Sequence, residues 1–318
     1  MNKENKFIGQ HMKAPAYNLI TPLKNEEENI KELTKCVLNQ SHKPKIWMII
    51  DDGSTDNTSD ILKKLCAEYN WIHSYKMEED AERTFGKHFA KVVRTGFEES
   101  LKYYSNVKYL AKVDADARFH PNMFKTLINK MEEREEFGIA SPRLITLKNK
   151  IDIGNLKKPE KIVNDKSLVL KSDKNRFDEP TDVVRIYRKK FLDEINGFPI
   201  TDASSEIINA KAVMNGYSVG FIDEWGYINR EIGTTLESMY TRGKLHGYRF
   251  YIEHYHPVLL LARFMWSLFD HPTRFIGELV GYFESFINKK EKMKDPDIIK
   301  YYSKERLKKL FKFIAEKN

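Results

Sequence analysis

The sequence Y-L-A-K-V-D-A-D-A-R-F-H-P, from Tyr109 to Pro121, joins a short apolar run to a pair of acids. Asp114 and Asp116 are separated only by Ala115, and because side chains alternate along an extended chain, both carboxylates point the same way. Two carboxylates held together repel each other and attract a cation. Oxygen ligands suit Mg²⁺ or Mn²⁺, which also bridges to substrate phosphates. Two interpretations are open: a metal site, or a solvated turn that leads into a helix near Pro121.

The position of this acid turn (residues 114–116) favours the metal site, because open α/β sheets bind ligands at the carboxyl ends of their strands. The rest of the chain fits such a sheet, since short apolar runs alternate with helix-length segments. We expect strands at 17–20, 47–50, 72–75, 109–113, 139–140, 183–187 and 217–222, and helices at 25–38, 58–69, 87–101, 121–133 and 205–214. The expected fold is an α/β fold with a doubly wound, mostly parallel, mixed sheet flanked by helices.

A second acid pair follows the second strand, in I-D-D-G-S-T-D-N-T from Ile50 to Thr58. Gly53 permits a tight turn, and the small polar residues after it offer N-caps for the next helix. Turn chemistry does not explain why Asp51 and Asp52 are adjacent at a strand's end. Further along, Lys87 lies at the start of an expected helix, where an ammonium and unbonded N–H groups together suit a phosphate.

The composition limits the class of protein. The chain has 318 residues with 41% hydrophobic content and a net charge of +8, which suits an anionic partner such as a nucleotide, a phosphate or a membrane surface. Cys36 and Cys66 have no ligand-spaced neighbours, so neither zinc nor a disulfide framework is expected. Residues 1–16 contain no apolar run, so no signal peptide is expected, and no apolar stretch is long enough to span a bilayer.

The amino-acid composition of the chain changes after His256. Two apolar-rich helices are expected at 258–269 and 275–287, followed by a strongly basic stretch that ends in a helix at 303–315. Apolar helices beside a basic cluster suit shallow insertion into an anionic leaflet, and the alternative is packing on the core or on a second subunit. We therefore expect a polar tail at 1–16, a main domain at 17–256 and a helical, basic appendage at 257–318.

The motifs, taken in order, resemble those of family 2 glycosyltransferases, which have the GT-A fold. T-P-L-K-N-E (Thr21–Glu26) resembles the family's P-x-x-N-E, I-D-D-G-S-T-D-N-T matches its second block, and D-A-D is placed like its DxD motif. I-N-G-F (Ile195–Phe198) resembles the later G-G-F, so the resemblance covers about residues 17–235.

The resemblance implies inverting, non-processive transfer of a sugar from a UDP- or GDP-sugar, with Mg²⁺ or Mn²⁺ as cofactor. Asp116 is then the metal ligand, and Asp114 lies near the metal or the ribose. His254 is a further metal candidate, because a His in this region completes the metal shell in some GT-A enzymes. The implied nucleotide-sugar-binding residues are Thr21, Pro22, Leu23, Glu26, Asp52, Lys87, Asp114, Ala115 and Arg230.

The sequence departs from the family pattern where the general base is expected. Ser204-Ser205 stands in place of Glu-Asp before the helix that ends at Gly216, so Asp202 and Glu206 are the remaining candidates. Glu206 has a second interpretation, since an acid also favours a helix N-terminus. N-R-E-I-G-T-T (Asn229–Thr235) resembles a segment of polyprenyl-phosphate sugar transferases, which would place Arg230 on a phosphate. A phosphate acceptor is already ionised and needs no base.

The acceptor implied is a glycan hydroxyl or a lipid-linked substrate, and no nucleic-acid partner is expected. The expected location is the cytoplasm, with peripheral contact to the membrane's cytoplasmic face and a homodimer as further expectations. Two alternatives remain: a nucleotide-sugar-binding protein with impaired catalysis, and a nucleotidyltransferase. A nucleotidyltransferase would have a Gly-rich, basic loop after the first strand, and T-P-L-K-N-E is not such a loop. Q-x-x-R-W, the motif of processive synthases, is absent from the sequence.

Overall fold

The computed structural model describes residues 14–78, 85–147, 169–172, 182–228 and 239–308, together with 311 and 315. The chain divides into two compact units. Unit 1 consists of Met1–Asp80, Val92–Gly197 and Ser218–Asn229, and unit 2 of Ala81–Lys91, Phe198–Tyr217 and Arg230–Asn318. The domain boundaries expected at residues 16 and 256 stay predictions.

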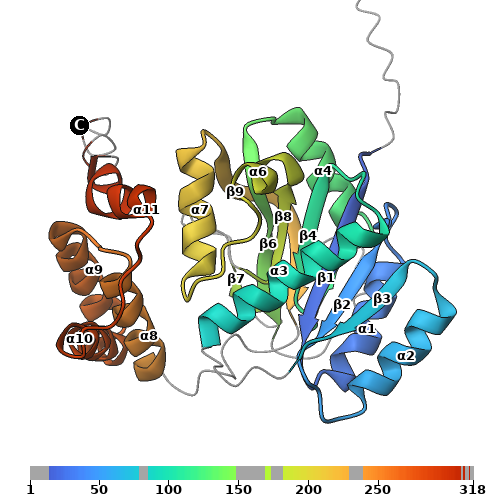
Figure 1. The fold of residues 1–318 in the computed structure, drawn as a ribbon, viewed down its shortest axis with the longest axis horizontal. Helices are drawn as coiled ribbons and strands as arrows, with labels where there is room; N and C mark the ends of the chain where they lie inside the picture. Colours follow the sequence, from blue (N-terminus) through green and yellow to red (C-terminus); the bar gives the residue numbers. More distant parts are fainter. Residues whose placement is uncertain are drawn as a thin grey trace, which may run out of the picture. The chain divides into compact units, whose positions relative to one another are not determined.

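Within the described residues, unit 1 holds one nine-stranded sheet in the order β3-β2-β1-β4-β8-β6-β9-β5, with β7 paired to β6 (Figure 1). β3, β2, β1 and β4 are mutually parallel neighbours, whereas β8 runs antiparallel to β4 and to β6. This confirms the predicted mixed sheet flanked by helices. The strands are β1 Tyr17–Leu23, β2 Trp47–Asp51, β3 Ile72–Lys76, β4 Tyr109–Val113, β5 Ala117–Phe119, β6 Phe137–Leu147, β7 Val169–Ser172, β8 Val184–Arg188 and β9 Ser218–Ile228.

Helices cover both faces of this sheet. On one face, Tyr17 and Leu19 of β1 belong to the same buried core as Ile30, Leu62 and Phe124, which come from α1, α2 and α4. α3 crosses the other face, as Figure 1 shows. The helices around the sheet are α1 Glu27–Leu38, α2 Thr58–Glu68, α3 Phe85–Tyr103, α4 Met123–Glu133 and α6 Lys189–Glu194.

β1 is longer than predicted, because it continues through Pro22 to Leu23. Its pairing with β4 ends at Ile20, whereas its pairing with β2 continues to Leu23 opposite Asp51. Proline lacks an N–H donor and is tolerated where a strand is paired on one side only. The extension carries β1 as far as the end of β2.

Unit 2 is helical in its described part. α7 packs through Ala203, Ile207 and Ala210 against Ile298 and Tyr302 of the C-terminal segment. No described helix of the protein is long and apolar enough to cross a membrane. The elements are α7 Ser204–Met214, α8 Met239–Ile252, α9 Pro257–Asp270, α10 Pro272–Ile287, α11 Pro296–Lys300 and a π-helical turn, η2, at Tyr301–Glu305.

α8 was not predicted, and it packs on α10 through glycines. A Cβ atom on Gly243 or Gly247 of α8 would lie 2.1 and 2.0 Å from carbonyl oxygens of α10. Gly277 and Gly281 of α10 approach carbonyls of α8 in the same way, at 2.2 and 2.0 Å. Two small-x-x-x-small pairs thus let the two backbones pack without side chains between them. An apolar stripe, the usual signal of a helix, is therefore missing from the contact face of α8.

Candidate active site

The parallel pairing of β2, β1 and β4 brings three predicted site segments to one edge of the sheet. Thr21–Leu23 ends β1, Asp51-Asp52 ends β2, and Asp114 follows β4. Because neighbouring parallel strands end on the same side, these segments lie next to one another at their carboxyl ends. This is the edge where open α/β sheets bind ligands.

The loops after β1 and β2 are fastened together by hydrogen bonds between motif residues. The Asn25 N–H donates to Ser54 Oγ at 3.0 Å, and the Thr55 N–H donates back to Asn25 Oδ1 at 2.7 Å. The Glu26 N–H donates to Thr58 Oγ1 at 3.0 Å. Asn25 adopts φ +55°, a left-handed conformation that Asn tolerates better than most residues. The P-x-x-N-E segment and the D-D-G-S-T-D-N-T segment therefore form one hydrogen-bonded unit.

The two adjacent acids at the end of β2 have different surroundings. Asp51 is buried and accepts hydrogen bonds from the Ser54 N–H at 2.8 Å and from Ser59 Oγ at 2.5 Å, so it fixes the turn and the start of α2. Asp52 is half-buried, and its N–H donates to the Leu23 carbonyl at 2.9 Å. Asp51 is thus structural, and Asp52 is the acid of the pair that reaches the edge.

The predicted pocket residues of β1 also differ in exposure. Thr21 is fully buried, and its Oγ1 accepts a hydrogen bond from Trp47 Nε1 at 2.9 Å. Leu23 is buried and Pro22 is half-buried. Glu26 is half-buried and accepts a hydrogen bond from Asn29 Nδ2 at 2.8 Å.

The acid turn is held by a buried ammonium group. Lys112 of β4 is 1% exposed, and its Nζ lies 2.6 Å from Asp114 Oδ1. The same ammonium donates to the Asp182 backbone carbonyl. Burial raises the pKa of Asp114 to about 6, with Lys112 opposing this rise and Asp116 adding to it. A buried Lys in the strand was not predicted, because charged residues are rarely placed inside a sheet.

A second buried cation, Arg118, fixes the backbone of the acid turn. Its Nη1 donates to the carbonyls of Ala115 and Ala117, both at 2.9 Å, and its Nη2 donates to Asn29 Oδ1 at 2.9 Å. Asn29 in turn binds Glu26. The turn is therefore connected through Arg118 and Asn29 to the P-x-x-N-E segment. Arg118 directly follows D-A-D-A in the sequence, yet nothing in the motif signals this role.

In unit 2, both carboxylate oxygens of Asp202 are engaged. Oδ1 accepts from the Lys87 backbone N–H at 3.0 Å, and Oδ2 accepts from the Tyr248 hydroxyl at 2.8 Å. Burial, and then Asp202, raise the pKa of Tyr248. A Cβ on Gly86 would lie 2.4 Å from the Asp202 backbone oxygen, so glycine is required there. One N–H of the predicted phosphate site at Lys87 is thus bound by a carboxylate.

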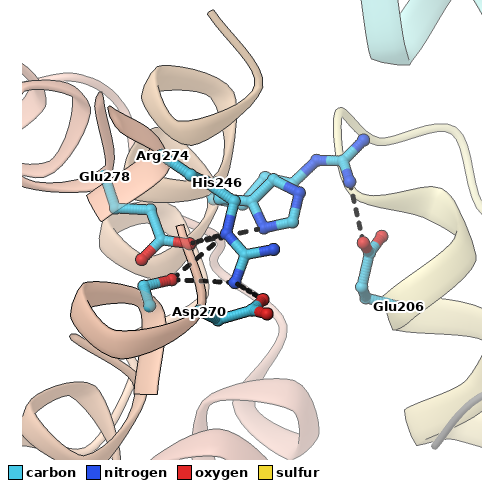
Figure 2. Close-up of polar contacts among 7 residues, drawn as sticks. Glu206, His246, Asp270, Arg274 and Glu278 are labelled. Atoms are coloured by element: carbon cyan, nitrogen blue, oxygen red, sulfur yellow. Dashed lines mark hydrogen bonds and ion pairs between the residues drawn. The ribbon is translucent and has the colours of Figure 1, made fainter. Parts of the chain in front are cut away.

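Glu206, the other candidate base, forms an ion pair with Arg249. Arg249 Nη1 lies 2.7 Å from Glu206 Oε1, as Figure 2 shows at the labelled Glu206. Arg249 comes from α8 and Glu206 from the first turn of α7. The acid therefore has a cationic partner from the neighbouring helix.

The remaining predicted ligands are His254 and Arg230. His254 adopts φ +55°, and its Nε2 lies 3.1 Å from the Met293 carbonyl. Arg230 lies outside the described residues. Among the described residues, no group of three or more His, Cys, Asp or Glu side chains could hold a metal ion by itself. Two carboxylates still fit Mg²⁺ or Mn²⁺, which is bound by one or two protein carboxylates plus substrate phosphates.

The family model for "Glycosyl transferase family 2" matches residues 18–195. This match covers more than half of the sequence and includes both fastened loops and the acid turn. The chain belongs to glycosyl transferase family 2.

Individual relatives are distant. An uncharacterized protein of Methanocaldococcus jannaschii, MJ0544, is 32% identical over 136 residues, which is 42% of this chain and 55% of that protein. The beta-monoglucosyldiacylglycerol synthase of a Nostoc species is 29% identical over 132 residues, covering 41% of this chain and 26% of that enzyme. The chain spans about half or less of the length of these relatives. The solved structure of S. aureus TarS residues 1–349 has a TM-score of 0.50 at 14% identity, covering 86% of this chain and 92% of that one. This likeness confirms the predicted GT-A fold.

Proposed function

We propose that the protein transfers a single sugar from a UDP- or GDP-sugar to an acceptor hydroxyl or a lipid phosphate, with inversion at the anomeric carbon. The observation that carries this proposal is the joined pair of loops beside the acid turn, at the carboxyl ends of β1, β2 and β4. Family 2 membership supports a nucleotide-sugar as the donor.

The described contacts suggest how the donor is held. In this proposal Asp52, half-buried at the end of β2, hydrogen-bonds the nucleotide base, and Pro22 and Leu23 at the end of the neighbouring β1 line its pocket. Because Lys112 compensates the charge of Asp114 at 2.6 Å, Asp116 is the better ligand for a cation. Asp114 would then bind the ribose or share the metal with Asp116.

A divalent ion held by Asp116 would stabilise the negative charge that grows on the leaving nucleoside diphosphate. The chain's own part is to orient the donor. The Arg118 contacts to Ala115 and Ala117 fix the turn backbone, and the loop–loop hydrogen bonds fix the base-binding edge. Pre-set ligands of this kind lower the cost of ordering the site when the donor binds.

Whether the reaction needs a general base depends on the acceptor. For a hydroxyl acceptor, Asp202 or Glu206 would remove the proton, and both are engaged by neighbours, Tyr248 and Arg249 respectively. For a phosphate acceptor no base is needed. The second candidate function, nucleotide-sugar binding without turnover, draws support from these engaged carboxylates.

A panel of radiolabelled UDP- and GDP-sugars with Mn²⁺ tests the proposal. Transfer to a lipid-phosphate or glycan acceptor, or slow release of the nucleoside diphosphate with one donor, is expected. Binding of a donor without transfer or hydrolysis on any acceptor would favour the non-catalytic alternative. Nucleotidyl transfer, seen as pyrophosphate release from a nucleoside triphosphate, would overturn the glycosyltransferase assignment.

A further inference from the structure

α9 and α10 expose large apolar side chains to an unusual degree. Their most exposed members are Leu261 (64%), Trp266 (67%) and Phe269 (79%) of α9, and Phe283 (54%), Phe286 (62%) and Ile287 (73%) of α10. At 100° per residue, each group of three occupies one side of its helix. We name these six side chains the α9–α10 apolar face.

On their inner sides the same helices bury polar residues beside the apolar side chains Leu260 and Phe264. Ser267, Glu278 and Ser285 are buried at 0%, 0% and 4% exposure. Arg274 Nε lies 3.4 Å from Glu278 and 3.2 Å from the Ser267 hydroxyl, a cluster that Figure 2 shows around the labelled Arg274. The two helices therefore pack on their inner sides through apolar as well as polar groups, and their outer sides are apolar too, unlike a helix whose outer side meets water.

Charge around the face is positive. The other two acids of α9 and α10 are paired with cations: Asp270 lies 3.2 Å from Arg274, and Glu284 lies 2.6 Å from Lys244. Lys289 and Lys290 are exposed directly after α10. From residue 257 to the last residue of the sequence, thirteen Lys and Arg stand against eight Asp and Glu.

We propose that an anionic lipid bilayer covers the α9–α10 apolar face, with both helices lying in the interface and Lys289 and Lys290 at the headgroups. Interfacial helices combine an apolar side with flanking basic residues, and Trp is favoured at this depth. A second copy of the chain is a weaker candidate, because it would bring the same excess of positive charge to the contact. This proposal holds whether or not sugar transfer is the reaction.

Flotation of the full chain with vesicles tests the proposal. Two vesicle types are compared: phosphatidylcholine alone, and phosphatidylcholine mixed with phosphatidylglycerol. Trp266→Glu/Phe269→Glu should lower partitioning onto the anionic vesicles at least ~10-fold, because two inserted aromatic rings become charged. Tyr103→Glu/Met214→Glu adds the same charge at exposed apolar side chains outside α9 and α10, and it should float like the wild type. Lys289→Glu/Lys290→Glu should remove the preference for anionic lipid.

Trp266 supplies a second readout. Its fluorescence should shift to the blue with anionic vesicles and be quenched by brominated lipid, whereas Trp47 is fully buried and should not respond. Trp266→Phe should lose the signal and still float.

Three results would overturn the proposal: wild type that stays soluble on both vesicle types, a Trp266→Glu/Phe269→Glu variant that floats like wild type, or a wild-type dimer that this variant converts to monomers without any flotation. Donor hydrolysis, measured without vesicles, should be unchanged in that variant, which separates this test from the test of function.

Discussion

The Arg118 guanidinium donates a 2.9 Å hydrogen bond to the backbone carbonyl of Ala115, the central residue of the acid turn. Arg118 is 3% exposed and contacts the turn through the backbone carbonyls of Ala115 and Ala117, so it acts by positioning the turn. Arg118→Ala should leave two buried carbonyls unsatisfied, costing ~1–3 kcal/mol of stability, and should raise the KM for the donor more than it lowers kcat. Unfolding in urea and donor titrations at several Mn²⁺ concentrations measure both effects.

Arg134→Ala is the matched control for Arg118, because Arg134 is exposed, pairs with the surface acid Glu136 at 3.0 Å and lies 4.2 Å above the Phe137 ring, away from the acid turn. It should leave KM unchanged and cost at most ~1 kcal/mol of stability. Arg118→Lys should recover part of the stability but not the two-carbonyl contact. Equal KM values in wild type and Arg118→Ala would show that the turn does not need this support.

Asp202 and Tyr248 give a test of the base. Asp202→Asn or Glu206→Gln should slow transfer to a hydroxyl acceptor by ~10²–10⁴-fold if that residue is the base. Tyr248→Phe removes the 2.8 Å hydrogen bond to Asp202 and keeps the carboxylate, so it should retain most of the rate. Near wild-type rates in both acid variants would point to a phosphate acceptor.

The glycines between α8 and α10 are the basis of a stability prediction. Gly247→Ala places a Cβ where a carbonyl oxygen now lies 2.0 Å away, so the helices must separate. We expect a loss of ~1–3 kcal/mol or more, by the cost of overpacking. Lys244→Ala, on the same helix, removes only a surface ion pair with Glu284 and should cost well under ~1 kcal/mol. Equal thermal midpoints for the two variants would contradict the close packing.

His246 predicts a pH dependence of stability. Burial first, and then Arg249, Arg263, Arg274 and Arg242, lower its pKa from 6.5 to about 3. Below pH 6.5 the unfolded chain takes up a proton that the folded unit does not, so the free energy of unfolding should fall as the pH drops. His246→Gln should reduce this fall, measured by urea unfolding at pH 7 and pH 5. Glu278, which lies 3.9 Å from His246, has a raised pKa and opposes the trend in both proteins.

The sequence predicted the sheet and its ligand-binding edge because both follow from local patterns. β2 and β4 are continuous apolar runs, and buried strands of a parallel sheet have this pattern. The acid pairs follow those strands directly, so pairing alone brings them together. The sequence did not indicate that β8 is a strand that runs antiparallel to its neighbours, because a strand's direction depends on its long connection and not on its own residues.

The residues that hold the acid turn could not be predicted from the sequence, for a different reason. Lys112 and Arg118 are charged, so their residue type indicates the surface, and only the three-dimensional contacts show why they are buried. Asp51 and Asp52 are identical in type and adjacent, yet one holds a turn and the other reaches the edge. α8 was missed because glycines, which disfavour helices in isolation, form its contact face.

The central claim is that Asp116 holds the metal that a nucleotide-sugar needs, and calorimetry of UDP and GDP binding with and without Mn²⁺ tests it most directly. Wild type should bind one of the two nucleotides, with Mn²⁺ strengthening binding at least ~10-fold, because the ion bridges the diphosphate to the acid turn. Asp116→Ala should lose that strengthening and keep the weak, metal-independent binding. Binding of either nucleotide that is unchanged by Mn²⁺ or by Asp116→Ala would contradict the account.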